Sequence, residues 1–112
     1  MNTQTAVRRV EDTIMVPTAA GLRPRRVLFR GAGLSVTENT GHDRTIGKYS
    51  LTHGASGERF GYCNTLGVAQ KMLAAVEATG VPWTESKATV RAFPDAGPLT
   101  FAAIRGAGGW MS

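Results

Sequence analysis

The chain has 112 residues, 42% of them hydrophobic and 19% charged, and its formal net charge is +5. This size and composition are typical of one globular domain, and they exclude a collagen, a coiled coil and wholesale disorder. No apolar run approaches the roughly 18 residues that cross a bilayer, and the first residues lack the pattern of a signal peptide. We therefore expect a cytoplasmic protein with no membrane partner, in which the lone Cys63 forms no intramolecular disulfide.

The positive charge is concentrated near the N-terminus. Residues 1–30 contain six arginines and two acidic residues, a net charge of +4, whereas residues 31–112 contain seven basic and six acidic residues, a net charge of +1. Arginine suits phosphate and carboxylate groups because its planar guanidinium donates paired hydrogen bonds. The N-terminal region is therefore the expected binding surface for an anionic partner.

The first 30 residues predict strands interrupted by glycine and proline. Residues 1–6 are expected to fray, and a strand follows whose apolar side chains share one side, namely Val10, Ile14 and Val16. Gly21 and Pro24 interrupt any regular pattern, which predicts a loop over residues 17–25. Residues 27–30 then resume a strand.

Two glycines follow this strand. Gly31 and Gly33 predict either a turn between two short strands or a glycine bulge within one strand, which continues to Thr37. The next residues, ENTGHDR, are rich in residues that favour turns. We expect a turn over residues 38–44.

A β-hairpin is predicted over residues 45–63, with residues 54–57 as a four-residue loop. In this register, position i faces position 111 − i, which pairs two sets of bulky residues, Leu51 with Phe60 and Tyr49 with Tyr62. Since side chains alternate along a strand, these four residues are expected on one face, toward the core. The other face, expected to meet mostly solvent, carries Lys48, Thr52, Arg59 and Cys63.

An amphipathic helix is predicted over residues 66–79. Its apolar stripe has the helical spacing i, i+3, i+4 and i+7, at Ala69, Met72, Leu73 and Val76. Thr65 can cap its start, and Gly80 followed by Pro82 can end it. This helix is expected to cover the apolar face of the hairpin.

The C-terminal part predicts further short elements. Residues 88–93 alternate as in a strand, and a short helix is expected between Asp95 and Gly106, with a strand over residues 99–105 as the alternative. Residues 106–112 are expected to form a flexible glycine-rich tail, unless Trp110 folds back onto the body. The whole chain, residues 1–112, is thus predicted to be a single α+β domain in which a small antiparallel sheet of about four or five strands packs against one main helix.

Several patterns resemble catalytic motifs and have simpler interpretations. The glycines around Ala32 resemble the start of a dinucleotide-binding fingerprint, but Val36 replaces its third glycine. Ser56 resembles the nucleophile of an elbow motif, but Glu58 replaces the second glycine, which favours a hairpin loop. His53 is expected to form a surface cross-strand pair with Glu58.

No metal or cofactor is predicted. The side chains able to bind a metal do not have the spacing of a zinc site, namely His42, Asp43, His53 and Cys63. A lone cysteine at a strand end is usually a small, partly buried hydrophobic residue. Neither a nucleophile with its base nor a metal centre is indicated, so an enzyme is the least favoured class.

Basic residues supply the predicted binding surface. An aromatic and basic run at residues 58–62 is only loosely similar to an RNA-recognition motif, and Phe60 and Tyr62 are better placed in the core. The candidate binding residues are all cationic and comprise Arg8, Arg9, Arg23, Arg25, Arg26, Arg30, Lys48 and Arg59. A solvated basic face without a partner is the competing interpretation.

One series of features covers about one-third of the chain: the SLTH strand, the Ser56-Gly57 turn, the aromatic strand, the alanine-rich helix and the VPWT segment. This series resembles short proteins encoded by bacteria, plasmids and phages. It implies a small accessory binding protein, of the kind with which phages and mobile elements modulate host machinery. Our first hypothesis is a non-enzymatic module that contacts nucleic acid or a nucleic-acid-handling protein. The alternative is a protein-interaction module or homodimer that uses the hairpin edge or the helix face around Ala74 and Ala78.

Overall fold

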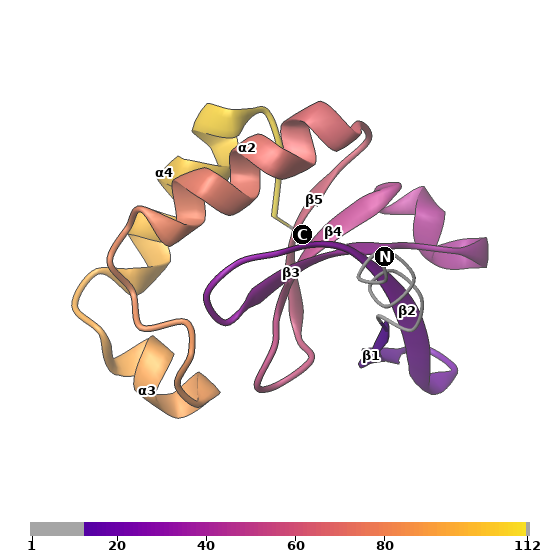
Figure 1. Ribbon diagram of the computed structural model, residues 1–112, viewed down its shortest axis with the longest axis horizontal. Helices are drawn as coiled ribbons and strands as arrows, with labels where there is room; N and C mark the ends of the chain where they lie inside the picture. Colours follow the sequence, from indigo (N-terminus) through magenta and orange to yellow (C-terminus); the bar gives the residue numbers. More distant parts are fainter. Residues whose placement is uncertain (1–12, 112) are drawn as a thin grey trace, which may run out of the picture.

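The computed structural model describes residues 13–111 and confirms the predicted α+β fold. Five antiparallel strands form one sheet in the order β1-β2-β3-β4-β5, so that each strand pairs with its neighbour in sequence (Figure 1). The strands are β1 (Thr13–Thr18), β2 (Gly21–Arg30), β3 (Leu34–Glu38), β4 (Tyr49–His53) and β5 (Arg59–Cys63). Val10 and the predicted frayed residues 1–6 lie outside the described residues.

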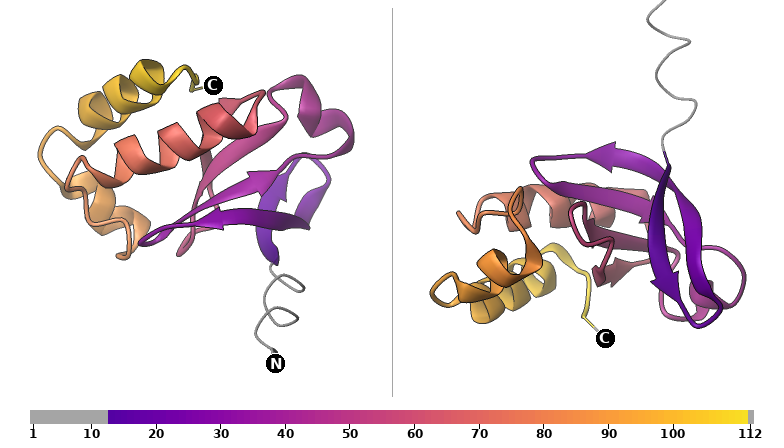
Figure 2. Two further views of the ribbon diagram at one scale, coloured as in Figure 1. Left: turned by 45° about the horizontal axis from the view of Figure 1, so that its top comes forward. Right: turned by 90° about the horizontal axis from the view of Figure 1, so that it is seen from below.

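The helices follow or interrupt this sheet. A short 3-10 helix, η1 (Gly41–Thr45), connects β3 to β4, and three α-helices follow β5, namely α2 (Leu66–Glu77), α3 (Lys87–Ala92) and α4 (Ala96–Ala107). Helix α2 packs on the sheet, and α4 packs beside α2 (Figure 2). None of the helices in residues 13–111 is long and apolar enough to cross a membrane.

Helix α2 forms as predicted. Its buried residues are the four of the apolar stripe, Ala69, Met72, Leu73 and Val76, and the Thr65 hydroxyl accepts a hydrogen bond from the N–H of Val68 at 3.2 Å. Gly80 follows with a φ of +83°, a conformation that favours glycine. The indole Nε1 of Trp83 donates to the carbonyl of Val76 at 3.1 Å, which satisfies a carbonyl in the last turn of the helix.

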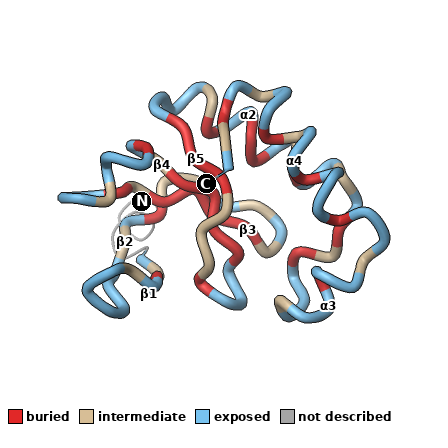
Figure 3. The backbone as a smooth tube through the Cα atoms, turned by 180° about the vertical axis from the view of Figure 1, so that it is seen from behind, coloured by how far each residue is buried: buried red, intermediate tan, exposed pale blue. Residues whose placement is uncertain are grey.

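The hydrophobic core lies between the sheet and α2. From β3 and β4 it takes Leu34, Val36 and Leu51, each no more than 1% exposed, and from α4 it takes the fully buried Ile104. Buried residues are accordingly concentrated along β3, β4, β5 and α2 (Figure 3). The elements that the sequence predicted most clearly thus form the centre of the molecule.

The predicted hairpin register holds only beside the loop. Thr52 pairs with Arg59 as expected, but a bulge follows, and Leu51 pairs with Gly61 and Tyr49 with Cys63. An inserted residue shifts every later side chain to the other face. Cys63 is therefore in the core beside α2, and Tyr62, paired with Ser50, faces the opposite side of the sheet.

The second face of the sheet is buried, which corrects the expectation that it meets solvent. Thr37, Ser50 and Thr52 are fully buried there, and the hydroxyl of Thr37 lies 2.9 Å from that of Ser50 and 3.0 Å from that of Thr52. The β1–β2 hairpin covers this face, where Val16 is also fully buried. The sheet therefore has an apolar face under the helices and a hydrogen-bonded polar face under the hairpin.

The loop predicted over residues 17–25 is wrong, because β1 continues to Thr18 and β2 begins at Gly21 and continues through Pro24. Thr18 pairs with Gly21, which leaves a two-residue turn, and the Thr18 hydroxyl accepts from the N–H of Ala20. Pro24 pairs with Met15 of β1, in the part of β2 that has no partner on its other side. Proline is tolerated at such a position because its missing N–H interrupts no ladder of a central strand.

The C-terminal part contains one incorrect and one correct prediction. The strand predicted over residues 88–93 is instead α3, because Ser86 caps a helix by accepting from the N–H of Thr89. The helix predicted from Asp95 is confirmed as α4, which excludes the strand over 99–105. Trp110 folds back onto the body, which is the second of the two expectations for the tail. Its backbone pairs with Tyr62 of β5 through two hydrogen bonds of 2.8 and 3.0 Å.

We predict that Leu73→Ala lowers the free energy of unfolding by about 2–5 kcal/mol, because it leaves a cavity under α2. Leu73 is 8% exposed, whereas Leu66 in the same helix is 43% exposed. Leu66→Ala is the matched control, with an expected loss of less than about 1 kcal/mol. Urea denaturation measures both, and equal losses would show that α2 does not pack as described.

Candidate functional site

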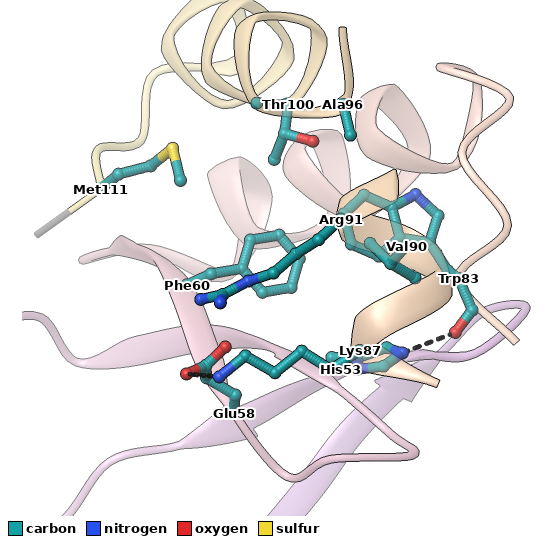
Figure 4. A pocket seen from close by; sticks show the side chains of 11 residues that line it. His53, Glu58, Phe60, Trp83, Lys87, Val90, Arg91, Ala96, Thr100 and Met111 are labelled. Carbon is teal, nitrogen blue, oxygen red and sulfur yellow. Dashed lines mark hydrogen bonds and ion pairs between the residues drawn. The ribbon is translucent and has the colours of Figure 1, made fainter. Parts of the chain in front are cut away.

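A pocket opens between the β4–β5 hairpin, the loop before α3, and helices α3 and α4 (Figure 4). Its volume is about 460 Å³. The apolar lining comes from Phe60, Trp83, Val90, Ala96 and Met111, and the polar lining from His53, Glu58, Lys87, Arg91 and Thr100. Most of these residues follow β4, so the pocket lies far in sequence from the N-terminal arginines of the predicted binding surface.

Two stacked aromatic rings form one wall of the pocket. Phe60 and Trp83 lie parallel, with ring centroids 5.1 Å apart and an interplanar angle of 5°. The bulge beside Phe60 places this ring on the helical side of the sheet, where Trp83 is held by its hydrogen bond to α2. Gly33 allows this arrangement, because a Cβ there would lie 2.3 Å from the carbonyl carbon of Trp83.

His53 holds the loop that carries Trp83. His53 is 4% exposed, and its Nε2 lies 3.0 Å from the carbonyl oxygen of Trp83 and 2.9 Å from that of Glu85. Since both neighbours are acceptors, Nε2 carries the proton. The expected surface pair with Glu58 is wrong. Only the backbones pair, while the carboxylate of Glu58 binds Lys87 at 2.8 Å.

Ser56 and His53 form a contact that the sequence did not predict. The hydroxyl of Ser56 lies 2.9 Å from Nδ1 of His53, the distance of a nucleophile and its base. The same hydroxyl accepts from the N–H of Glu58 at 3.1 Å, so it stabilises the hairpin loop. Ser56 does not line the pocket. The geometry therefore favours a structural role for this pair.

The glycine turn between β2 and β3 contacts other parts of the protein itself. The N–H of Ala32 donates to the carboxylate of Glu77 at 2.7 Å, so an acidic side chain occupies the place of a phosphate. Gly33, with a φ of +77°, packs against the backbone of Trp83. The turn joins two strands, one of the two arrangements expected for it.

Two of the predicted binding residues are engaged inside the fold. Asp43 of η1 accepts from Nη2 of Arg25 at 2.6 Å and from Nη1 of Arg59 at 3.2 Å. All three side chains are largely buried, with exposed fractions of 15%, 11% and 9% for Asp43, Arg25 and Arg59. Burial alone would raise the pKa of Asp43, but the hydrogen bond from Arg25 and the charges of both arginines lower it below its usual value.

The other predicted binding residues are exposed but dispersed. Arg23 and Arg26 lie in β2, Arg30 at its end near Ser35, and Lys48 before β4. Arg8 and Arg9 lie outside the described residues. A second cavity, of about 340 Å³, lies between the β1–β2 turn and η1, and its lining includes Arg23, Arg25, His42 and Asp43.

The surfaces proposed for self-association differ in accessibility. Ala74 is exposed on α2, and Ala78 is exposed directly after the end of this helix. By contrast, the N–H and carbonyl of Tyr62 are paired with Trp110, so this point of the β5 edge is closed to a second chain.

Within residues 13–111, no three His, Cys, Asp or Glu side chains gather as metal ligands do. Comparisons with family models, curated proteins and solved structures find no significant match to this chain.

We predict that Asp43→Asn lowers the free energy of unfolding by about 3 kcal/mol at neutral pH, because Arg25 and Arg59 keep their charges and lose their counter-charge. The lowered pKa of Asp43 means that its stabilising effect is present above the unfolded value, about 3.9, and is lost as pH falls through the folded value. The difference between wild type and variant should therefore shrink at low pH. Urea titrations at neutral and acidic pH test this, and a constant difference would contradict it.

We also predict that the thiol of Cys63 resists alkylation in the folded protein. Cys63 is fully buried, its Sγ donates to the carbonyl of Thr65 at 3.4 Å, and burial raises the pKa of the thiol. The reactive thiolate is therefore disfavoured. Iodoacetamide labelling followed by mass spectrometry should be slow in buffer and fast in denaturant. Comparable rates in both conditions would show an accessible thiol.

Proposed function

We propose that this protein is a non-enzymatic binding module whose β1–β2 hairpin contacts an anionic partner, of which nucleic acid is the first candidate. The observation that carries this proposal is the absence of acidic residues between Thr13 and Thr37, a segment that contains four arginines. The side chain of Asp43 reaches this hairpin from η1 and pairs with Arg25. Arg23 and Arg26 form no ion pair with a carboxylate of residues 13–111, so their positive charge is available to a partner.

The pairing of the hairpin supports exposure of this charge. Residues 21–26 of β2 pair only with β1, whereas β3 pairs from Val27 onward. This part is a two-stranded ribbon, a shape that fits the major groove of DNA. Arg26 shares its outer face with the exposed Met15 and Leu22, because residues paired across antiparallel strands point to the same side. Arg23 is exposed on the other face, beside η1, where Arg44 is also exposed.

A narrower set of binding residues follows from this arrangement. Arg25 and Arg59 are better assigned to stability, since both are bound to Asp43. Arg23 and Arg26 are left as the exposed arginines of the ribbon. Phosphate contacts from these two side chains would give affinity with little dependence on sequence.

The test is fluorescence anisotropy with a labelled DNA duplex over a salt series. Arg23→Gln combined with Arg26→Gln should weaken binding and should reduce the slope of log affinity against log salt by about 0.9 for each phosphate that is no longer neutralised. Lys71→Gln combined with Arg105→Gln is the control, because it removes the same charge from exposed positions in α2 and α4.

Equal effects of the two double variants would reject the ribbon as the contact surface and leave only a net-charge effect. If wild type does not bind the duplex, the same variants are tested with an acidic polypeptide. Loss of that binding in the ribbon variant alone would assign an acidic protein surface as the partner, since charge steers such encounters.

A further inference from the structure

The pocket between β5, α3 and α4 has the dimensions of a small-molecule site. Its volume of about 460 Å³ lies in the usual range of about 300–1,000 Å³ for such sites. Apolar side chains line most of it, with a few polar groups that converge from different elements, as ligand sites require. None of its lining residues belongs to the β1–β2 hairpin, so the pocket is independent of the proposed function.

Two sets of polar groups in the pocket are already satisfied. Both ring nitrogens of His53 are hydrogen-bonded, to Ser56 on one side and to the carbonyls of the loop on the other. Lys87 and Glu58 neutralise each other through an ion pair of 2.8 Å. These groups build the wall and do not add net charge.

Arg91 supplies the excess charge of the pocket. It lies one helical turn after Lys87 in α3, and its side chain extends toward the pocket in front of Phe60 (Figure 4). No carboxylate of residues 13–111 forms an ion pair with it. Thr100 points into the same space from α4 and offers a hydroxyl (Figure 4). A ligand that neutralises this pocket must therefore carry an anionic group.

The apolar lining of the pocket indicates the chemistry of the part of the ligand that carries no charge. Trp83 stacks on Phe60, which fixes the orientation of the Phe60 ring beside the pocket. Val90 and Met111 lie across the same space. Aromatic rings favour such surroundings, because they add ring-to-ring contacts to the burial of apolar area.

We propose that this pocket binds a small aromatic anion, with the ring of the ligand between Phe60, Val90 and Met111 and its anionic group on Arg91. Thr100 is the second polar contact for that group. A carboxylate and a phosphate offer the same chemistry to a guanidinium, since both accept paired hydrogen bonds.

Two fluorescent probes that differ in charge test the proposal. Anilinonaphthalene sulfonate carries an anionic group, and N-phenyl-1-naphthylamine has the same rings without it. We expect the sulfonate to bind wild type with a stoichiometry of one. Arg91→Gln should weaken the binding of the sulfonate by about tenfold, which corresponds to about 1.4 kcal/mol, and should leave the affinity of the neutral probe unchanged.

Arg105→Gln is the matched control, because it removes an exposed arginine from α4 that does not line the pocket. It should leave both affinities unchanged. Equal weakening by the two arginine variants, absence of sulfonate binding, or binding at several sites would overturn the proposal.

Competition then distinguishes the natural anionic groups. Displacement of the sulfonate probe by 1-naphthoate alone assigns a carboxylate ligand, and displacement by 1-naphthyl phosphate alone assigns a phosphate ligand. Displacement by both supports the shared chemistry, whereas displacement by neither would overturn the proposal.

Discussion

The ion pairs of Asp43 connect three segments that are separate in sequence. Arg25 comes from the β1–β2 hairpin, Arg59 from β5, and Asp43 from the 3-10 helix after β3. Arg59 also donates to the side-chain oxygen of Asn39 at 3.1 Å and to the carbonyl of Pro17 at 3.0 Å. One arginine thus ties β1 to the rest of the sheet. The β1–β2 hairpin covers the second face of the sheet because these contacts hold it there.

The polar face depends on a continuous set of hydrogen bonds that begins at this cluster. The side-chain oxygen of Asn39 accepts hydrogen bonds from the hydroxyl of Ser50 and from Nη1 of Arg59. The hydroxyl of Ser50 is also hydrogen-bonded to that of Thr37, which is in turn hydrogen-bonded to that of Thr52. Each of these side chains is fully or largely buried, where an unpaired polar group costs about 1–3 kcal/mol. The buried Nε of Arg25 has no partner among the described residues, which is a local cost of this arrangement. Removing one member leaves its neighbours unpaired, so the network acts as a unit.

The division of the arginines has a direct consequence for function. Arg23, Arg25 and Arg26 are close in sequence, but alternation along β2 places Arg26 on the face opposite Arg23 and Arg25. The ion pair with Asp43 then separates Arg25 from Arg23. Arg25 could contact a partner only by breaking its ion pair with Asp43, which would lower the stability of the fold. The exposed charge of the ribbon and the aromatic pocket beside α3 consequently form two independent surfaces.

Local patterns in the sequence predicted the parts of the fold that local forces determine. The stripe of α2, its threonine cap and Gly80 follow from helical spacing and backbone preference, and the structure contains them all. The bulge beside Phe60 has no such pattern, because it depends on packing against Trp83, more than 20 residues later. Long-range contacts also determine the surroundings of the candidate site residues. His53, for example, is buried because its ring bonds to the carbonyls of Trp83 and Glu85, which local sequence patterns do not indicate. The alternation of residues 88–93 suggested a strand, although Ser86 with Thr89 is a recognisable helix start that would have predicted α3.

The central claim is that Asp43 couples the hairpin to the sheet, and a double-mutant cycle tests it most directly. Unfolding free energies would be measured for wild type, Asp43→Asn, Arg25→Gln and the combined variant. A buried, hydrogen-bonded pair predicts a coupling energy above about 1 kcal/mol, so that the double variant loses much less than the two single losses together. Losses that add to within about 0.5 kcal/mol would show that the two residues act independently and would contradict the account.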